Sequence, residues 1–396
     1  MADTPKVRFK GFTGAWEQRK LGEIILDYTE KNPDGEDLPV LTSSRQGIQK
    51  QEDHFGSEQK HDTTDYNVIP KGYCTYRNRS DDKTFTFNVN DCVQRGIVSK
   101  FYPVFSIENG DAKFITEYLN TNAEIRNKLA VLAVGTSQVV LSLKNLKTLD
   151  ILVPSKGEQD KVGQVIISLD HLITLHQRKC DETKELKKYM LQKMFPKDGE
   201  KIPEIRFKGF TEDWEQRKLG DVFAERIERA NGDEELLSVT IGNGVIRQAD
   251  SDKRNTASED RSNYKVVRKG DVPYNSMRMW QGAVGNSEYD GIVSPAYTVL
   301  VPMAAANGKF FMELFKKEST LKIFQRWSQG LTSDTWNLKY PVLSTIELYM
   351  PSLEEQTKIA NYFLGFDHLI TLHQRKCDQL KEVKKFMLQN MFPQKG

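Results

Sequence analysis

Two stretches of this chain occur twice, about 198 positions apart, while the residues between the copies are barely alike. Residues 8–22 return nearly unchanged as residues 206–220, and residues 170–181 return letter for letter as residues 367–378. This period is too long for a solenoid, whose repeats run to roughly 20–50 residues. The chain therefore contains a duplicated domain and helix. The identical parts are expected to present one surface twice, and the divergent parts to recognise two different things.

Length and composition favour two globular domains. The chain has 396 residues, which exceeds one ordinary core, and its 38% hydrophobic and 28% charged residues are typical of a folded, surface-rich protein. No apolar run approaches the roughly 18 residues of a membrane span, and the N-terminus has no apolar signal region, so we expect a cytoplasmic location. Four cysteines do not make a disulfide framework. The net charge of +2 by itself gives little support to nucleic-acid binding.

Each duplicated arm is followed by a divergent body, the first from about Glu23 to Asp150. Matching short runs lie at residues 66–72 and 264–270, at 96–99 and 291–294, and at Lys113-Phe114 and Lys309-Phe310. The first two pairs are apolar runs bounded by glycine, proline and asparagine, which predicts strands and turns, and the third opens an amphipathic helix. We predict that both bodies share one mixed α/β (α+β) fold and that their variable loops carry specificity.

A long helix follows each body. Ser155 and Ser352 are predicted N-caps, with Glu158 and Glu355 at capping-box spacing. The Met-Phe-Pro sequences that end at residues 196 and 393 stop both helices at the same place.

Residues at spacings of three and four predict a heptad seam along each helix. The seam consists of Ile166, Leu169, Ile173, His176, Cys180, Thr183, Lys187, Met190 and Met194 in the first helix, and Phe363, Phe366, Ile370, His373, Cys377, Leu380, Lys384, Met387 and Met391 in the second. If the helices pair within one chain they run antiparallel, which gives a pseudo-two-fold axis. Each helix would be roughly 58 Å long. A parallel coiled coil between two chains is the alternative.

The sequence lacks the usual catalytic motifs. It has no phosphate-binding G-x-x-x-x-G-K-[ST] loop, no H-E-x-x-H and no G-x-S-x-G. Asn32-Pro33-Asp34 does not fit the Asn/Asp-Pro-Pro-aromatic tetrad of amino-methylating enzymes. We therefore predict a chain that is not itself catalytic.

Two histidines and two cysteines on the seam could in principle bind zinc, since two antiparallel helices could bring His176, Cys180, His373 and Cys377 together. Their spacing is helical rather than that of a zinc knuckle. Packing of small polar seam residues is the favoured interpretation, so no metal site is predicted.

Polar clusters of the kinds that contact DNA fall at corresponding places in the two bodies, after Lys-Gly and before the last strand. Arginine suits guanine, asparagine and glutamine suit adenine, and serine, threonine and lysine suit phosphates. Each cluster taken alone is more often a solvated loop, and the clusters gain weight because they fall at corresponding places in both bodies. The candidates are Ser43, Ser44, Arg45, Gln46, Tyr76, Arg77, Asn78, Arg79, Thr136, Ser137 and Gln138 in the first body, and Asn243, Asn275, Ser276, Arg278, Trp280, Gln281, Thr332, Ser333, Trp336 and Asn337 in the second.

This arrangement resembles the specificity subunit of type I restriction-modification enzymes along essentially the whole chain. The most specific features are the Trp-Glu-x-x-Lys-Leu-Gly arms, residues 16–22 and 214–220, and the Pro-x-x-x-Glu-Gln helix starts, residues 154–159 and 351–356. The resemblance implies two target-recognition domains, each reading one half of a bipartite, asymmetric double-stranded DNA target. The paired helices would set the spacing and hold two methyltransferase subunits, and two restriction (translocase) subunits would complete the enzyme.

The resemblance also implies that S-adenosylmethionine, ATP and magnesium belong to the partner subunits and that this chain holds no cofactor. The complete enzyme would be a type I site-specific deoxyribonuclease and adenine-N6 methyltransferase. The predicted division is residues 1–153 for arm and first domain, 154–199 for helix and linker, 200–350 for second arm and domain, and 351–396 for the last helix. A duplicated interaction scaffold without DNA specificity is the alternative function.

Overall fold

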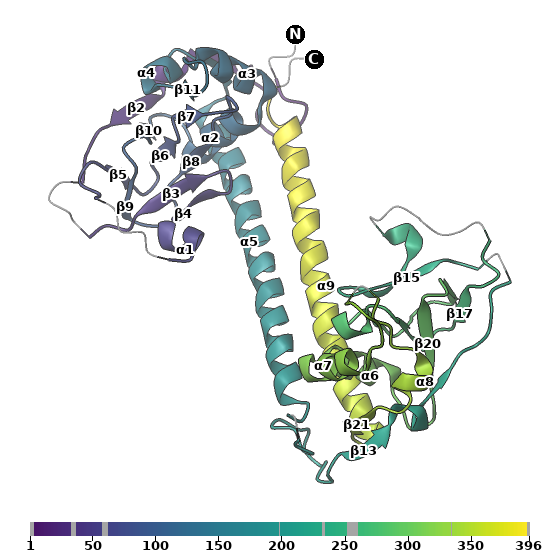
Figure 1. Cartoon of the computed structure of the whole chain (residues 1–396). Helices are drawn as coiled ribbons and strands as arrows, with labels where there is room; N and C mark the ends of the chain where they lie inside the picture. Colours follow the sequence, from purple (N-terminus) through teal and green to yellow (C-terminus); the bar gives the residue numbers. More distant parts are fainter. Residues whose placement is uncertain are drawn as a thin grey trace. The chain divides into compact units, whose positions relative to one another are not determined.

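A computed structural model describes residues 4–32, 37–57, 62–197, 199–231, 234–251, 260–333 and 335–393. Figure 1 labels the long helices and many of the other elements. The chain divides into a first unit, residues 1–177 with 374–396, and a second unit, residues 178–373. Parts of the predictions above fall on residues outside the described ones. They are the two ends of the predicted division, Pro33 and Asp34 of the rejected tetrad, and residue 198 within the predicted linker.

The first body is built on an antiparallel sheet in the order β2 (Ile25–Tyr28), β10 (Val104–Ile107), β6 (Cys74–Tyr76) and β8 (Phe87–Val89). Further antiparallel pairs are β1 (Glu17–Lys20) with β12 (Asp150–Val153), β3 (Leu41–Ser44) with β4 (Gly47–Lys50), β5 (Asn67–Pro70) with β9 (Arg95–Val98), and β7 (Arg79–Ser80) with β11 (Val139–Val140). Its helices are α1 (Gln51–Phe55), α2 (Ala112–Thr121), α3 (Ala123–Leu132), α4 (Leu143–Leu146) and the 3-10 helix η1 (Leu21–Glu23).

The second body repeats this pairing. Its sheet has the order β14 (Phe223–Glu225), β20 (Tyr297–Pro302) and β18 (Val272–Asn275). The antiparallel pairs are β13 (Glu215–Lys218) with β21 (Glu347–Met350), β15 (Leu237–Thr240) with β16 (Gly244–Arg247), and β17 (Lys265–Val267) with β19 (Gly291–Val293). Its helices are α6 (Gly308–Lys316), α7 (Glu318–Trp327), α8 (Tyr340–Leu343) and the 3-10 helices η3 (Leu219–Asp221), η4 (Gln248–Asp250) and η5 (Met279–Gln281).

The register of the pairs is also repeated. Glu17 lies opposite Val153, just as Glu215 lies opposite Met350. The prediction of a mixed fold shared by both bodies is confirmed. The first body differs in β8 and in the β7–β11 pair, which have no strand counterpart among the described residues of the second.

In each body a capped helix places a phenylalanine in the core. Asp111 caps α2 by accepting from the backbone N of Phe114 at 2.7 Å, and Asn307 caps α6 by accepting from the backbone N of Phe310 at 3.2 Å. Phe114 and Phe310 are fully buried one residue into the predicted amphipathic stretches. The caps satisfy backbone groups that a helix start otherwise leaves unpaired.

The two long helices, α5 (Lys156–Lys193) and α9 (Leu353–Asn390), contain 38 residues each. Every predicted seam residue is buried or half-buried, which confirms the heptad pattern. Within each unit the two helices contribute antiparallel segments. In the first unit, the thiol of Cys377 faces the carbonyl of Ile173 at 3.9 Å, and Lys384 Nζ lies 2.7 Å from Asp170 Oδ1.

The second unit has the equivalent contacts. The thiol of Cys180 faces the carbonyl of Ile370 at 3.9 Å, and Lys187 Nζ lies 2.8 Å from Asp367 Oδ1. In both units the residue numbers rise along one helix as they fall along the other, as predicted for an intramolecular pair.

The predicted N-cap is confirmed at Ser352, whose Oγ accepts from the backbone N of Glu355 at 3.4 Å, but the glutamates do not complete the predicted capping boxes. Glu158 receives two bonds from the guanidinium of Arg8, at 2.7 and 2.6 Å, and Glu355 receives two from Arg206, at 2.7 and 2.8 Å. These carboxylates therefore fasten the arms to the helices. The reason is that an arginine brought in by a distant segment offers a charged, bidentate donor, which is stronger than a neutral backbone amide.

Each arm also meets the far end of the other long helix in its unit. The backbone N of Val7 donates to the carbonyl of Asn390 at 2.9 Å, and that of Ile205 donates to the carbonyl of Lys193 at 2.9 Å. The Met-Phe pairs after these helix ends, Met391-Phe392 and Met194-Phe195, are buried in the first and second cores respectively.

Candidate nucleic-acid interface

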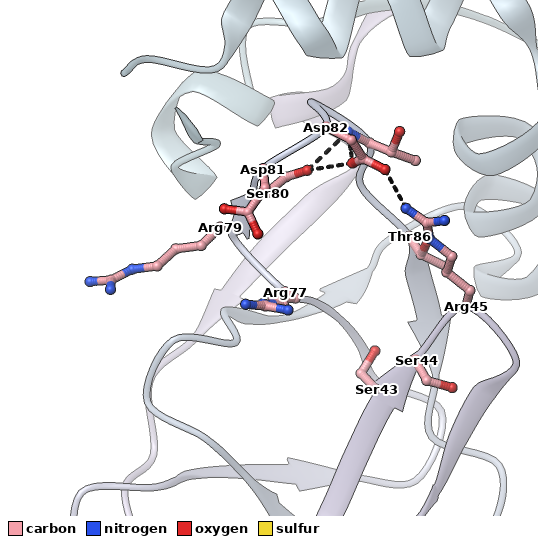
Figure 2. A pocket seen from close by; sticks show the side chains of 10 residues that line it. Ser43, Ser44, Arg45, Arg77, Arg79, Ser80, Asp81, Asp82 and Thr86 are labelled. Atoms are coloured by element: carbon pink, nitrogen blue, oxygen red, sulfur yellow. Dashed lines mark hydrogen bonds and ion pairs between the residues drawn. The ribbon is translucent and has the colours of Figure 1, made fainter. Parts of the chain in front are cut away.

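A polar pocket gathers five of the predicted site residues of the first body. Ser43, Ser44 and Arg45 come from the end of β3 and its turn, and Arg77 and Arg79 from the segment after β6. Figure 2 shows them around one hollow, together with residues of the turn after β7. The remaining lining residues are Ser80, Asp81, Asp82, Thr84 and Thr86.

Asp82 organises one wall of the pocket. It accepts from Ser80 Oγ at 2.8 Å and from the backbone N of Thr84 at 2.9 Å, and it forms an ion pair with Arg45 (Figure 2). The bonds from Ser80, Thr84 and Arg45, in that order of importance, hold the pKa of Asp82 well below its usual range. Asp82 therefore stays charged and keeps the turn and Arg45 in place.

The other two arginines are placed differently. The guanidinium of Arg79 lies over the ring of Phe101, with its central carbon 4.1 Å from the ring centre. Arg77 is exposed, and its side chain makes no hydrogen bond or ion pair within the described part of the chain. Its five donors are therefore free for a ligand with paired acceptors, such as a guanine edge or a phosphate.

Two predicted site residues of the first body, Tyr76 and Asn78, do not line the pocket. Tyr76 is fully buried and its hydroxyl donates to the carbonyl of Leu141 at 2.9 Å, so assigning it to the interface was wrong. Asn78 uses its carbonyl to accept from the backbone N of Leu141 at 2.9 Å, and its half-buried side chain does not line the pocket. Strand β6 includes Tyr76, so the buried strand continues into the polar cluster that the sequence suggested.

The remaining candidates of the first body border the pocket. Gln46 lines an adjoining groove that shares Arg45 with it. Thr136 and Ser137 are exposed in the loop before β11 and do not line the pocket. Gln138 reaches it indirectly, because its Nε2 donates to Asp81 Oδ1 at 3.1 Å.

Sequence reasoning missed Asp81, Asp82, Thr84 and Thr86. They directly follow Arg79 and Ser80, so proximity to a predicted cluster could have indicated them. The pairing of Asp82 with Arg45 spans 37 positions, so no local pattern in the sequence indicates it.

Two buried hydrogen bonds fix the correspondence between the bodies. Tyr274 donates to the carbonyl of Leu338 at 2.9 Å, as Tyr76 does to Leu141, and the backbone N of Leu338 donates to Ser276, as that of Leu141 does to Asn78. By this alignment Asn275 takes the place of Arg77, and Met277 the place of Arg79. Arg278 is therefore not the counterpart of Arg77.

The candidates after β18 have mixed surroundings. Asn275 Oδ1 accepts from the backbone N of Met277 at 3.0 Å, which fixes the turn. Ser276 is buried and its hydroxyl bonds Thr298 at 2.8 Å, so its assignment to the interface was wrong. Arg278 is half-buried, and its side chain has no hydrogen bond or ion pair among the residues the structure describes.

Two tryptophans join the loops of the second body. The rings of Trp280 and Trp336 meet edge to face with centres 5.3 Å apart. This contact connects the segment after β18 to the segment before β21, as Gln138 and Asp81 connect the equivalent segments of the first body. Of the other candidates, Asn243, Thr332 and Ser333 are exposed, and Gln281 and Asn337 are half-buried.

The described residues were also compared with the requirements of a metal site and of a membrane span. They contain no group of three or more His, Cys, Asp and Glu side chains that could hold a metal ion. Cys180 and Cys377, considered above as zinc ligands, are buried on the seam. No described helix is both long and apolar enough to cross a membrane.

Comparison with known proteins identifies the family. The model of the type I restriction modification DNA specificity domain matches the chain twice, at residues 14–185 and 211–382. The chain belongs to this family. Each match covers one body with its helix, so the duplication in the sequence is a duplication of the specificity domain.

Individual relatives are distant. The type I restriction enzyme MjaVIII specificity subunit of Methanocaldococcus jannaschii is 23% identical over 279 residues, which is 63% of this chain and 63% of that subunit. The match thus spans less than two thirds of the relative's length.

Among solved structures, the S subunit of a type I restriction-modification system from M. genitalium is similar with a TM-score of 0.63 and 14% identity, covering 99% of this chain and 100% of that one. This likeness shows a common fold. The HsdS subunit from Thermoanaerobacter tengcongensis aligns with a TM-score of 0.44 and 17% identity, over 99% of both chains.

Proposed function

We propose that this specificity-domain protein is the DNA-reading subunit of a type I restriction-modification complex and is not itself catalytic. Each body would read one half of a bipartite, asymmetric double-stranded DNA target. The observation that carries the proposal is that two bodies of one fold hold different side chains at matched loop positions. The matched pairs are Arg77 and Asn275, and Arg79 and Met277.

The pocket of the first body supports contact with DNA. Arg45, Arg77 and Arg79 line it, and the half-buried Ser44 adds a hydroxyl of the kind that binds phosphates. Ser43 is buried, and its hydroxyl accepts from Asn88 Nδ2 at 2.8 Å, so it supports the wall of the pocket. We propose that Gln46, Thr136, Ser137 and Gln138 contact DNA beside this pocket. In the second body the equivalent contacts would come from Asn243, Asn275, Arg278, Trp280, Gln281, Thr332, Ser333, Trp336 and Asn337.

The long helices would set the spacing of the half-sites and dock two methyltransferase subunits. Exposed apolar residues, each one position before a seam residue, form a stripe on both helices. They are Leu172, Leu175, Val383 and Phe386 in the first unit, and Leu186, Tyr189, Leu369 and Leu372 in the second, with exposed fractions from 37% to 57%. Apolar patches of this kind mark interaction sites. Equivalent stripes in both units fit a partner present in two copies.

Two restriction subunits would complete the complex. S-adenosylmethionine, ATP and magnesium would be held by the partners, in the cytoplasm. We also propose that the functional regions of the chain end at residues 153, 199 and 350, as the sequence predicts. The alternative is a duplicated interaction scaffold without DNA specificity.

Methylation mapping tests the proposal. The full chain is produced with the methyltransferase subunit of its own system, and methylated adenines are mapped on genomic DNA. We expect a motif of two different specific parts separated by an unspecified gap. A continuous or palindromic motif would contradict the two-body reading, and duplex binding without any sequence preference would favour the scaffold.

A further inference from the structure

The turn after β7 places two carboxylates in the pocket of the first body, and the protein uses them differently. Asp82 is engaged by Ser80, Thr84 and Arg45, and the dashed lines of Figure 2 join it to Ser80 and Arg45. Asp81 receives one hydrogen bond, from Gln138 Nε2 at 3.1 Å, and has no other partner in the described ranges. Because an ionised carboxylate has about four acceptor sites, Asp81 keeps most of its capacity free.

The backbone holds Asp81 in a fixed position. Lys83, two residues further on, has a φ of 59°, in the left-handed region that residues other than glycine rarely adopt. Such a conformation is strained and persists only where its surroundings hold it. The three partners of Asp82 supply that restraint, so Asp81 is exposed on a preorganised turn.

A free carboxylate is unfavourable beside phosphates but compatible with this pocket. Arg45, Arg77 and Arg79 outnumber Asp81 and Asp82 among the lining residues, so the pocket keeps a positive balance. Anionic DNA is therefore attracted to the pocket as a whole, while Asp81 itself requires a hydrogen-bond donor.

The major groove offers two such donors, the N4 amino group of cytosine and the N6 amino group of adenine. Adenine also presents N7, an acceptor beside N6, which repels a carboxylate and matches an amide. Cytosine presents its amino group without that neighbour. The chemistry of a carboxylate therefore selects cytosine.

We propose that Asp81 is a specificity-determining residue that accepts a hydrogen bond from the N4 amino group of a cytosine in the half-site read by the first body. This inference rests on the proposed function. Arg77 lines the same pocket and supplies the donors that suit guanine, so this half-site contains at least one G·C pair.

The test compares wild-type, Asp81→Ala and Asp81→Asn complexes of the full chain with its methyltransferase subunits. Their methylation motifs are mapped, and binding is measured on duplexes in which each cytosine of the half-site is replaced in turn. Asp81→Ala should reduce discrimination at one cytosine by about 5- to 150-fold and leave the other half-site unchanged. Asp81→Asn should allow adenine at that position, because an amide matches its paired donor and acceptor.

A chemical probe separates direct from indirect effects. A duplex whose cytosine lacks the 4-amino group should bind wild type more weakly and Asp81→Ala no more weakly than the normal duplex. If removal of the amino group weakens binding by wild type and by Asp81→Ala equally, Asp81 does not accept a hydrogen bond from it and the proposal is wrong.

Glu108→Ala is the charge-matched control, because Glu108 lines a hollow beside the first arm that shares no residue with the pocket. If the methylation motif of Asp81→Ala is the same as that of wild type, the proposal is overturned. If Asp81→Ala forms no complex, Asp81→Asn decides instead, and a motif that still requires cytosine at this position overturns the proposal. Failure of the underlying function looks different, since the wild-type complex would then show no sequence preference.

Discussion

The segments at the C-terminal ends of β6 and β18 occupy the same place in the two bodies but present different chemistry. In the first body they carry Arg77 and Arg79, whereas the second body has Asn275 and Met277 at these positions. Met277 is 37% exposed. The buried bonds beneath, from Tyr76 and Tyr274, are the same. The fold is therefore held by groups that do not face the pocket, and the surface chemistry can change without altering it.

Exchanging a whole body tests this separation most severely. Replacing residues 23–150 with the corresponding region of another family member should change one half of the DNA target completely. The other half should stay as it is, because the second body has its own core. Methylation mapping of the chimaeric complex checks this, and a change in both halves would show that the bodies do not read independently.

The arms provide the opposite comparison, because here the two units should behave alike. Glu158→Ala and Glu355→Ala each leave an arginine without its bidentate partner, and their carboxylates are 2% and 1% exposed. We expect each to destabilise its own unit by about 3 kcal/mol. Calorimetry of the full chain measures both, and a large difference between the two losses would contradict the equivalence of the arms.

Single arginines probe the difference between the bodies more finely. Arg77→Ala should weaken binding by about 1–3 kcal/mol and relax one position of one half-site if this side chain reads a guanine. Arg278→Ala should do the same in the other half-site. Arg77→Lys is the matched control, since lysine keeps the charge but loses the planar fork. Wild-type preference in both alanine variants would place these arginines on phosphates or away from DNA.

Acid should reveal a smaller effect at the helix pair of the first unit. Burial raises the pKa of Asp170, but hydrogen bonds from Lys113 and Lys384 outweigh burial and leave it below its ordinary value. A lowered pKa in the folded state stabilises the protein above the ordinary value of about 4, and this contribution is lost as pH falls through the lowered pKa.

Asp170→Asn should therefore cost about 0.5–1 kcal/mol at pH 7 and progressively less below pH 4, because this side chain is 35% exposed and screened by solvent. Urea unfolding of both proteins across this range measures the difference. A cost that is the same at pH 7 and at pH 3 would show that the charge of Asp170 is not involved.

Much of the fold was predictable because its signals are local or repeated. The seam from Ile166 to Met194 follows from spacing alone, and the shared fold follows from matched runs. The contacts that build the site are not local. Arg45 forms an ion pair with Asp82, and Glu158 binds Arg8 instead of a backbone amide of its own helix. In both cases the fold brings a charged donor from a distant part of the sequence to the carboxylate. Tyr76 was predicted at the interface because polar residues follow it in the sequence, and these residues obscure the end of a buried strand.

The contact between Val7 and Asn390 shows that an arm can bind a helix end without a short connection between them. The same hydrogen bond between Ile205 and Lys193 joins segments that a short linker connects, whereas Val7 and Asn390 are far apart in the sequence. The linker is therefore not needed for this contact. A chain cut between residues 196 and 203 should retain the hydrogen bond between Ile205 and Lys193.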